Sequence, residues 1–233
     1  MSSKPEIDLQ CGLYIVATPI GNMADITLRA LETLRKVDFI CCEDTRESGK
    51  LTSAYDIKAQ KLSYHDHNAA EMRPKIIRLL QEGKSIALIS DAGMPLVSDP
   101  GYKLVQDCIA EDLYVTCVPG ASASLNALVL SGLPADRFFF AGFLPSKQSA
   151  RRQALGELKH IPGTLIFYET GPRLAESLAD MRDILGDRPA AVARELTKKF
   201  EETRRDTLSA LAASYEDAPP KGEIVLVVGA GGE

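Results

Sequence analysis

CxxC motifs are absent from this sequence, although it contains five cysteines. An odd number of cysteines with no paired spacing argues against a disulfide framework or a zinc site built on thiolates. Four of the five lie in or beside apolar runs. This placement favours reduced, buried thiols in a cytosolic protein.

Long apolar runs are also absent, and none approaches the ~20 residues that a membrane-spanning helix needs. The first ten residues, MSSKPEIDLQ, contain no apolar segment of the kind found in a signal peptide. The sequence therefore predicts a cytoplasmic globular protein.

Three common ligand-binding signatures are missing. The loop after the first predicted strand reads TPIGN instead of GxGxxG, which counts against an NAD or FAD site. The tripeptide GKS that ends at Ser85 precedes a strand, and Arg78 stands where a P-loop has its first glycine. His65 and His67 have no third histidine or spaced cysteine nearby, so we expect no metal site.

The composition is that of an ordinary α/β protein, with 233 residues, 45% hydrophobic and 25% charged. This length allows one large domain or two small ones. The net charge of −5 argues against a protein that coats nucleic acid generally, but it leaves room for a local basic patch.

The most informative stretch is IALISDAGMPLVSDPG, from Ile86 to Gly101. Its apolar start predicts a buried strand, and the strand ends in a loop that contains two carboxylates, two glycines and two prolines. Ligands of open α/β sheets bind outside the carboxyl ends of the strands, so a cofactor is expected here. The alternative is a rigid turn, since glycine and proline also mark ordinary loops.

Similar strand–loop–helix units precede this stretch. Leu13–Ala17 predicts a strand, and the helix after its loop begins near Asp25 or Thr27. Asp38–Cys42 predicts a second strand, followed by EDTR, which is either part of a site or a helix cap at Thr45 or Ser48. We also expect Pro74 near the start of a helix that ends at Gly83.

This alternation predicts a parallel α/β domain over residues 1–118 and a second α/β domain over residues 119–233, with the boundary near Pro119. In the second half, apolar runs predict strands at 138–141, 164–168, 190–194 and 224–228, with helices at 148–158, 174–185 and 207–214. Its basic clusters are either solvated helix faces or a docking surface; they contain Lys147, Arg151 and Arg152, and Lys198 and Lys199 with Arg204 and Arg205.

The order of motifs resembles the bacterial small-subunit (16S) ribosomal RNA cytidine 2′-O-ribose methyltransferases of the tetrapyrrole methylase superfamily. The motifs are TPIGN, EDTR, YHDHN, SDAGMPLVSDPG, VPGASA, GFLP, FYET and KGEIVLVV. The resemblance implies two α/β domains, the second with a mixed sheet, with S-adenosylmethionine (SAM) in the cleft between them, a homodimer, and small-subunit RNA or the 30S subunit as substrate. It implies that SAM is bound by Thr18, Pro19, Asp91, Gly93, Met94, Leu96, Val97, Ser122, Ala123, Tyr168, Ala193 and Gly222.

Attack of a ribose hydroxyl on a methyl group is helped by a nearby base that takes the proton. The candidates at strand ends are Glu43, Asp44 and His67, and Arg46 is expected to bind a phosphate or to orient a carboxylate. RNA contact is expected from Lys147, Arg151, Arg152, Lys198 and Lys199. No metal is expected to take part.

Three other functions remain open from the sequence alone. One is a methyltransferase that acts on tetrapyrrole carbons, and another is a dinucleotide-dependent oxidoreductase, which the missing GxGxxG disfavours. The third is a non-catalytic SAM-binding factor for ribosome assembly.

Overall fold

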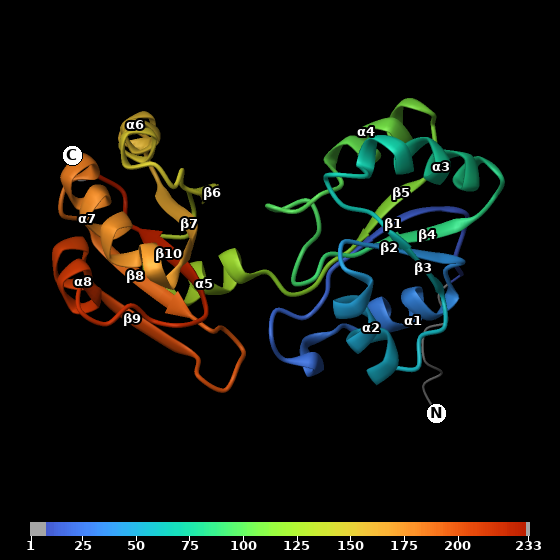
Figure 1. Ribbon diagram of the computed structural model, residues 1–233, viewed down its shortest axis with the longest axis horizontal. Helices are drawn as coiled ribbons and strands as arrows, with labels where there is room; N and C mark the ends of the chain where they lie inside the picture. Colours follow the sequence, from blue (N-terminus) through green and yellow to red (C-terminus); the bar gives the residue numbers. More distant parts are fainter. Residues whose placement is uncertain (1–7, 232–233) are drawn as a thin grey trace. The chain divides into compact units, whose positions relative to one another are not determined.

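The computed structural model describes residues 8–231, and contacts within the chain divide it into two units between Ser122 and Ala123. Each unit is built on one five-stranded sheet with helices on both faces (Figure 1). The division falls in the loop that follows Pro119, between the last strand of the first sheet and the next helix.

The first unit contains a fully parallel sheet, as predicted. Its strand order is β3-β2-β4-β1-β5, and the connections include a short 3-10 helix, η1, and four α-helices. The strands are β1 (Gly12–Val16), β2 (Phe39–Cys42), β3 (Gln60–Ser63), β4 (Ser85–Leu88) and β5 (Val115–Val118). The helices are η1 (Met23–Asp25), α1 (Leu28–Lys36), α2 (Thr45–Ala54), α3 (Ala69–Gln81) and α4 (Tyr102–Ala110).

Helices cover both faces of this sheet, which explains why its central strands read as short continuous apolar runs. Tyr14 and Val16 pack with buried residues of α1 and α2. Leu13 and Ile15, which alternate with them along β1, pack with α3 and α4 on the other face. Figure 1 shows the two helix pairs on opposite sides of the sheet.

Helix caps set where α1 and α2 begin. Thr27 caps α1 and accepts a hydrogen bond from the Ala30 amide, which confirms one of the two predicted positions for the start of this helix. The predicted cap of α2 at Thr45 or Ser48 is wrong, because Asp44 is the cap and accepts from the Arg46 amide at 2.7 Å. An aspartate in extended backbone caps a helix at least as well as threonine or serine.

The prediction of Pro74 near a helix start is also wrong, because Pro74 lies well inside α3. The helix begins earlier, where the Asn68 side chain accepts a hydrogen bond from the His65 amide at 2.9 Å. Proline at position 74 removes the bond to the Ala70 carbonyl. Ala70 is exposed, so water can replace that donor.

The second unit has a mixed sheet with the order β6-β7-β10-β8-β9, in which only the β6–β7 pairing is parallel. Its strands are β6 (Phe138–Phe143), β7 (Thr164–Thr170), β8 (Pro189–Arg194), β9 (Glu202–Thr207) and β10 (Glu223–Val228). Its helices are α5 (Ala123–Ser131), α6 (Gln148–Leu158), η2 (Gly171–Arg173), α7 (Leu174–Leu185) and α8 (Leu208–Tyr215). The predicted bounds of α6 and α7 are confirmed.

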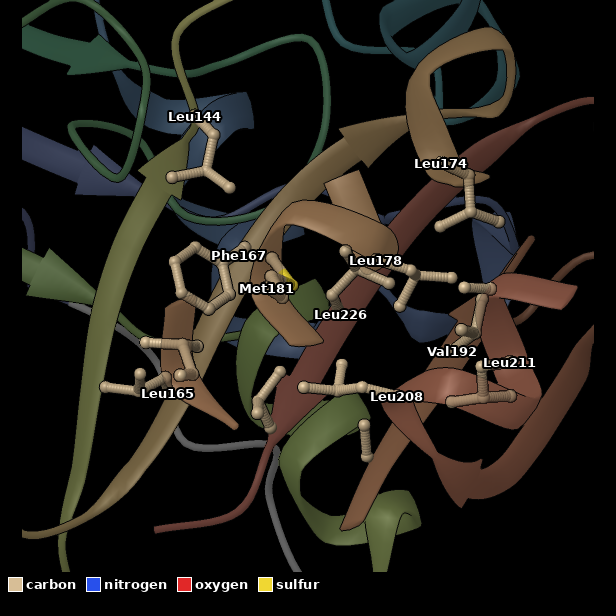
Figure 2. Packing of buried hydrophobic residues seen from close by; sticks show 14 of the residues in the cluster. Leu144, Leu165, Phe167, Leu174, Leu178, Met181, Val192, Leu208, Leu211 and Leu226 are labelled. Carbon is tan, nitrogen blue, oxygen red and sulfur yellow. The ribbon is translucent and has the colours of Figure 1, made fainter. Parts of the chain in front are cut away.

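The core of the second unit lies between this sheet and the helices α6, α7 and α8. Phe167 of β7 and Leu226 of β10 pack there against Leu178 and Met181 of α7 (Figure 2). Helix α5 packs on the opposite face of the sheet, against β7, β8 and β10. Within residues 8–231, no helix is both long and apolar enough to cross a membrane.

Sequence reasoning missed the strands β3 and β9, which are both edge strands. The residues of β3, QKLS, and of β9, ETRRDT, contain one large apolar side chain between them. An edge strand has one free side and is often polar, so the apolar pattern that revealed the inner strands is absent.

Candidate active site

Four loops follow β1, β2, β4 and β5 at the same edge of the parallel sheet, where ligands of such sheets bind. The loops after β1 and β4 are joined by an isolated antiparallel bridge between Thr18 and Gly93. Each residue donates its amide to the other's carbonyl, at 2.9 and 3.1 Å. The Thr18 hydroxyl also donates to the Ser90 carbonyl at 3.1 Å. Thr18, which is buried, therefore holds the two loops together.

The loop after β4 contains several unusual backbone conformations. Gly93 has a φ of 82°, and an added Cβ there would lie 3.2 Å from Ile20. Leu96 and Ser98 also have positive φ values of 72° and 67°, which are uncommon for residues with a side chain. Such conformations persist where surrounding structure enforces them, and they concentrate at binding sites.

The predicted cofactor residues of the first unit all lie in these loops, but they differ in exposure. Pro19, like Thr18 and Gly93, is buried and can shape a site only through packing or backbone. The remaining residues offer side chains or backbone to solvent: Asp91 is exposed, and Met94, Leu96, Val97 and Ser122 are half-buried, as is Ala123 at the start of α5.

A group of three carboxylates, Glu43, Asp91 and Asp99, lies at the ends of β2 and β4. The pKa of Glu43 is raised by burial and by the charges of Asp91 and Asp66. Burial also raises the pKa of Asp91, although the Asp44 amide donates to it. Within residues 8–231 no cation forms an ion pair with any of the three. The group therefore carries uncompensated negative charge.

Asp99 also belongs to this group, although it was not among the predicted site residues. Burial and the nearby Glu43 raise its pKa to about 6, and a hydrogen bond with Ser90 only partly offsets them. The loop contains the dipeptide SD twice, and this repeat is the sequence signal that could have pointed to Asp99.

Replacing Asp99 with asparagine is expected to stabilise the folded protein above pH 6. Because the pKa of Asp99 is higher in the folded than in the unfolded chain, this group's contribution to stability is greatest below about pH 4 and falls as the pH rises through about 6. The gain at pH 8 should be about 1–2 kcal/mol after allowance for partial exposure. Thermal unfolding of D99N, wild type and the surface control D136N between pH 4 and 8 tests this. A D99N difference that is constant with pH would contradict it.

Asp44 and Arg46 interact with each other at the start of α2. The Arg46 guanidinium donates to both carboxylate oxygens of Asp44, at 3.2 and 2.8 Å. These bonds and the Arg46 amide hold the pKa of Asp44 at about 2. Asp44 is thus a helix cap and a weak base, whereas Arg46 remains largely exposed and accessible to a phosphate.

The two histidines lie in the loop after β3. The exposed ring of His67 forms an edge contact with that of His65, with 5.9 Å between the ring centroids. The Nδ1 atom of His65 is buried and has no hydrogen-bond partner among residues 8–231. No group of three potential metal ligands occurs in the part of the chain that the structure describes.

In the second unit, the sheet register brings two predicted cofactor residues into one row. Val225 of β10 pairs with Tyr168 on one side and with Ala193 on the other, so all three point to the face that carries α5. Ala193 is fully buried and contributes packing. The Tyr168 ring is half-buried and makes edge contacts with Phe140 and Phe143, at centroid distances of 4.9 and 5.5 Å.

Gly222, a further predicted cofactor residue of this unit, lies against the loop after β8. Its φ is 103°, and an added Cβ would lie 2.4 Å from the Glu195 carboxylate. That carboxylate accepts from the Glu223 amide at 3.0 Å and from Lys198 at 3.1 Å. Glycine at position 222 therefore allows Glu195 to tie the two loops together.

Replacing Gly222 with alanine is expected to lower the free energy of unfolding by about 1–2 kcal/mol, because a side chain is strained at this φ and displaces Glu195. Urea denaturation of G222A measures the effect. Gly49 to alanine is the control, since an added Cβ there meets nothing within 4 Å. Equal stability of G222A and wild type would contradict the assignment.

The predicted RNA-binding residues differ in whether their side chains are already bound to carboxylates of the protein. The Arg151 side chain is only 1% exposed and bonds to Asp180 at 2.7 Å, so direct contact of Arg151 with RNA conflicts with its burial. Arg152 also bonds to Asp180, and Lys198 is held by Glu195 and Glu223. Lys147 and Lys199 are exposed and form no ion pair among the described residues, although the Lys199 ammonium lies 5.6 Å from the centroid of the Phe200 ring. A basic sequence cluster thus does not by itself reveal which cations are available.

Comparison with known proteins identifies the class to which this fold and these loops belong. The family model of the tetrapyrrole (corrin/porphyrin) methylases matches residues 12–212, so the chain belongs to that family. Among solved structures, a diphthine synthase aligns with a TM-score of 0.72 at 16% identity, over 94% of this chain and 89% of that one. A uroporphyrin-III C-methyltransferase from Thermus thermophilus, complexed with S-adenosyl homocysteine, aligns with a TM-score of 0.62 at 19% identity, over 94% and 97%. These two likenesses show the fold.

Sequence relatives are more specific. A ribosomal RNA small subunit methyltransferase I from Mesorhizobium japonicum is 57% identical over 97% of this chain and 77% of its own length. One from Halalkalibacterium halodurans is 50% identical over 95% and 76%. Within the tetrapyrrole methylases, the chain belongs to the ribosomal RNA small subunit methyltransferase I family. The predicted family and the two α/β domains are confirmed.

Proposed function

We propose that this protein transfers a methyl group from SAM to the ribose 2′-hydroxyl of a cytidine in the decoding centre of small-subunit ribosomal RNA. The observation that carries the proposal is 57% identity, over 97% of the chain, to a ribosomal RNA small subunit methyltransferase I. The loops that hold Glu43, Asp91 and Gly93 fall within the span that matches the family model.

The carboxylate group at the strand ends suits SAM. SAM has a positively charged sulfonium and a positively charged amino group, and Glu43, Asp91 and Asp99 carry negative charge that no ion pair within residues 8–231 neutralises. Partial burial is the main cause of the raised pKa of all three, and the charges of neighbouring carboxylates add to it. A cationic ligand bound there would lower them. Contact of Tyr168, Ala193 and Gly222 with the adenine of SAM stays a prediction.

The chemistry then needs a base and correct positioning. When bound, SAM supplies a methyl group on a positively charged sulfur, which is a good leaving group. Glu43 at the end of β2 remains accessible although its carboxyl group is partly desolvated, and its raised pKa makes it a better proton acceptor than Asp44. We assign Glu43 as the base that takes the 2′-hydroxyl proton. Arg46 binds an adjacent RNA phosphate, and His67 lines the site from the loop after β3.

RNA is the partner that this reaction requires. Lys147 and Lys199 provide phosphate contacts in the second unit. The substrate nucleotide must leave its stack to reach a bound cofactor. The protein acts as a homodimer in the cytoplasm, where small ribosomal subunits are found.

Expression in bacteria that lack their own enzyme of this family tests the proposal. Nucleosides from the small-subunit RNA of these cells are analysed by mass spectrometry, with and without the present protein. Restored 2′-O-methylcytidine supports the function. If a modified tetrapyrrole accumulates and the RNA stays unmodified, the protein is a tetrapyrrole methyltransferase instead.

A further inference from the structure

The edge strand β6 carries an aromatic face that has no role in the proposed methyl transfer. Phe138, Phe140 and Phe143 pair in register with Thr164, Ile166 and Tyr168 of β7, so they point to the same face of the sheet as Tyr168. Phe138 is 46% exposed and Phe143 is 55% exposed. Phe139 lies on the other face, in register with the core residue Leu165.

Cations lie at both ends of this strand, and their side chains form no ion pair or hydrogen bond within residues 8–231. Arg137 precedes Phe138, and Lys147 follows in the loop after β6. Among the described residues of the second unit, every arginine except Arg137 binds an acidic side chain or a backbone carbonyl. These committed arginines are Arg151, Arg152, Arg173, Arg182, Arg188, Arg194, Arg204 and Arg205.

We propose that the aromatic face of β6, defined by Phe138, Phe140 and Phe143, stacks unpaired bases of the RNA substrate while Arg137 and Lys147 bind its phosphates. Bases stack on exposed aromatic side chains of a sheet, and nearby cations follow the backbone. From Phe138 to Phe143 the strand extends ~16 Å, which is room for a few nucleotides. This inference rests on the proposed RNA substrate and adds how the RNA is held.

A second copy of the chain is the competing occupant, because exposed apolar edge strands also pair with one another. The structure disfavours that pairing. The β6 ladder is interrupted between Phe140 and Gly142, where Gly142 has a φ of 67°. Such a bulge protects an edge from strand addition. In addition, lysine is depleted from the centres of protein interfaces, whereas it is common at RNA sites.

The test compares F143A with F139A, which removes an equally large and similarly exposed ring from the opposite face of the same strand. Fluorescence anisotropy measures binding of a labelled single-stranded RNA of roughly ten nucleotides. Calorimetry measures binding of S-adenosylhomocysteine, and sedimentation gives the oligomeric state. We expect F143A to weaken RNA binding about tenfold, F143W to restore it, and F139A to leave it unchanged. K147Q should reduce the salt dependence of binding by about one phosphate contact.

Other outcomes overturn the proposal. If F143A and F139A bind RNA with equal affinity, and thermal unfolding shows that both variants are folded, the bases do not stack on this face. If F143A loses binding of S-adenosylhomocysteine but not of RNA, the face contacts adenine. If F143A dissociates a dimer that F139A leaves intact, the face contacts a second copy of the chain. If wild type modifies ribosomal RNA but F143A binds RNA normally, only this inference fails. If wild type modifies no RNA, the proposed function fails.

Discussion

Replacing Glu43 with glutamine is expected to lower the turnover number for methyl transfer at least ~100-fold, while the dissociation constant of SAM changes less than about threefold. Glutamine keeps the size and polarity of the side chain but cannot accept the hydroxyl proton. Burial and the charges of Asp91 and Asp66 raise the pKa of Glu43, so its carboxylate is a stronger base than a fully solvated one. The loss should therefore appear in the chemical step.

Two variants on the same segment serve as comparisons. Glu47, four residues further along in the first turn of α2, is paired with Lys50, and E47Q should keep near-normal turnover. D44N should also fold, because asparagine caps helices as well as aspartate does. Single-turnover rates at saturating SAM distinguish the candidates. If D44N or H67A loses turnover while E43Q keeps it, Glu43 is not the base.

Replacing Asp180 with alanine is expected to reduce the free energy of unfolding by about 3–5 kcal/mol. Asp180 on α7 is buried and accepts from Arg151 at 2.7 Å, from Arg152 at 2.8 Å and from Gln148 at 3.3 Å. Without this carboxylate, the buried Arg151 guanidinium retains a long contact with the exposed Glu176, at 3.4 Å, and the Ser146 carbonyl at 3.3 Å. An uncompensated charge in the core is strongly destabilising.

The exposed neighbour Asp183 gives a matched control, since it binds Arg152 at 3.2 Å at the surface. D183A should cost less than about 1 kcal/mol, and the double variant R151M/D180L should recover much of the stability lost in D180A. Urea unfolding followed by circular dichroism measures all three. Similar losses for D180A and D183A would show that the buried pair is not a stability determinant.

The sequence predicted the inner strands and the positions of the site loops because these depend on local signals. Buried parallel strands are apolar runs, and the Thr18 and Gly93 loops follow them directly. The edge strands β3 and β9 gave no such signal. The prediction that Pro74 lies near a helix start was wrong because proline is tolerated inside this helix, where the freed carbonyl faces water.

The chemistry of individual charged residues was harder to predict because it depends on partners far away in the sequence. Arg151 and Arg152 look alike in a basic cluster, and only packing against α7 shows that Arg151 is buried against Asp180. Asp44 and Glu43 are adjacent acids, yet one caps α2 at a pKa of about 2 and the other has a raised pKa. Asp99 is distinguished from other loop acids by its burial near Glu43.

The most direct measurement is transfer of a labelled methyl group from SAM by the purified protein, with small ribosomal subunits from cells lacking this modification and naked RNA as parallel substrates. Primer extension sensitive to 2′-O-methylation maps the product. We expect label at one decoding-centre cytidine, and a comparison of the two substrates shows whether the basic residues recognise assembled subunits or RNA alone. Absence of transfer to both substrates by protein that binds SAM would contradict the proposed function.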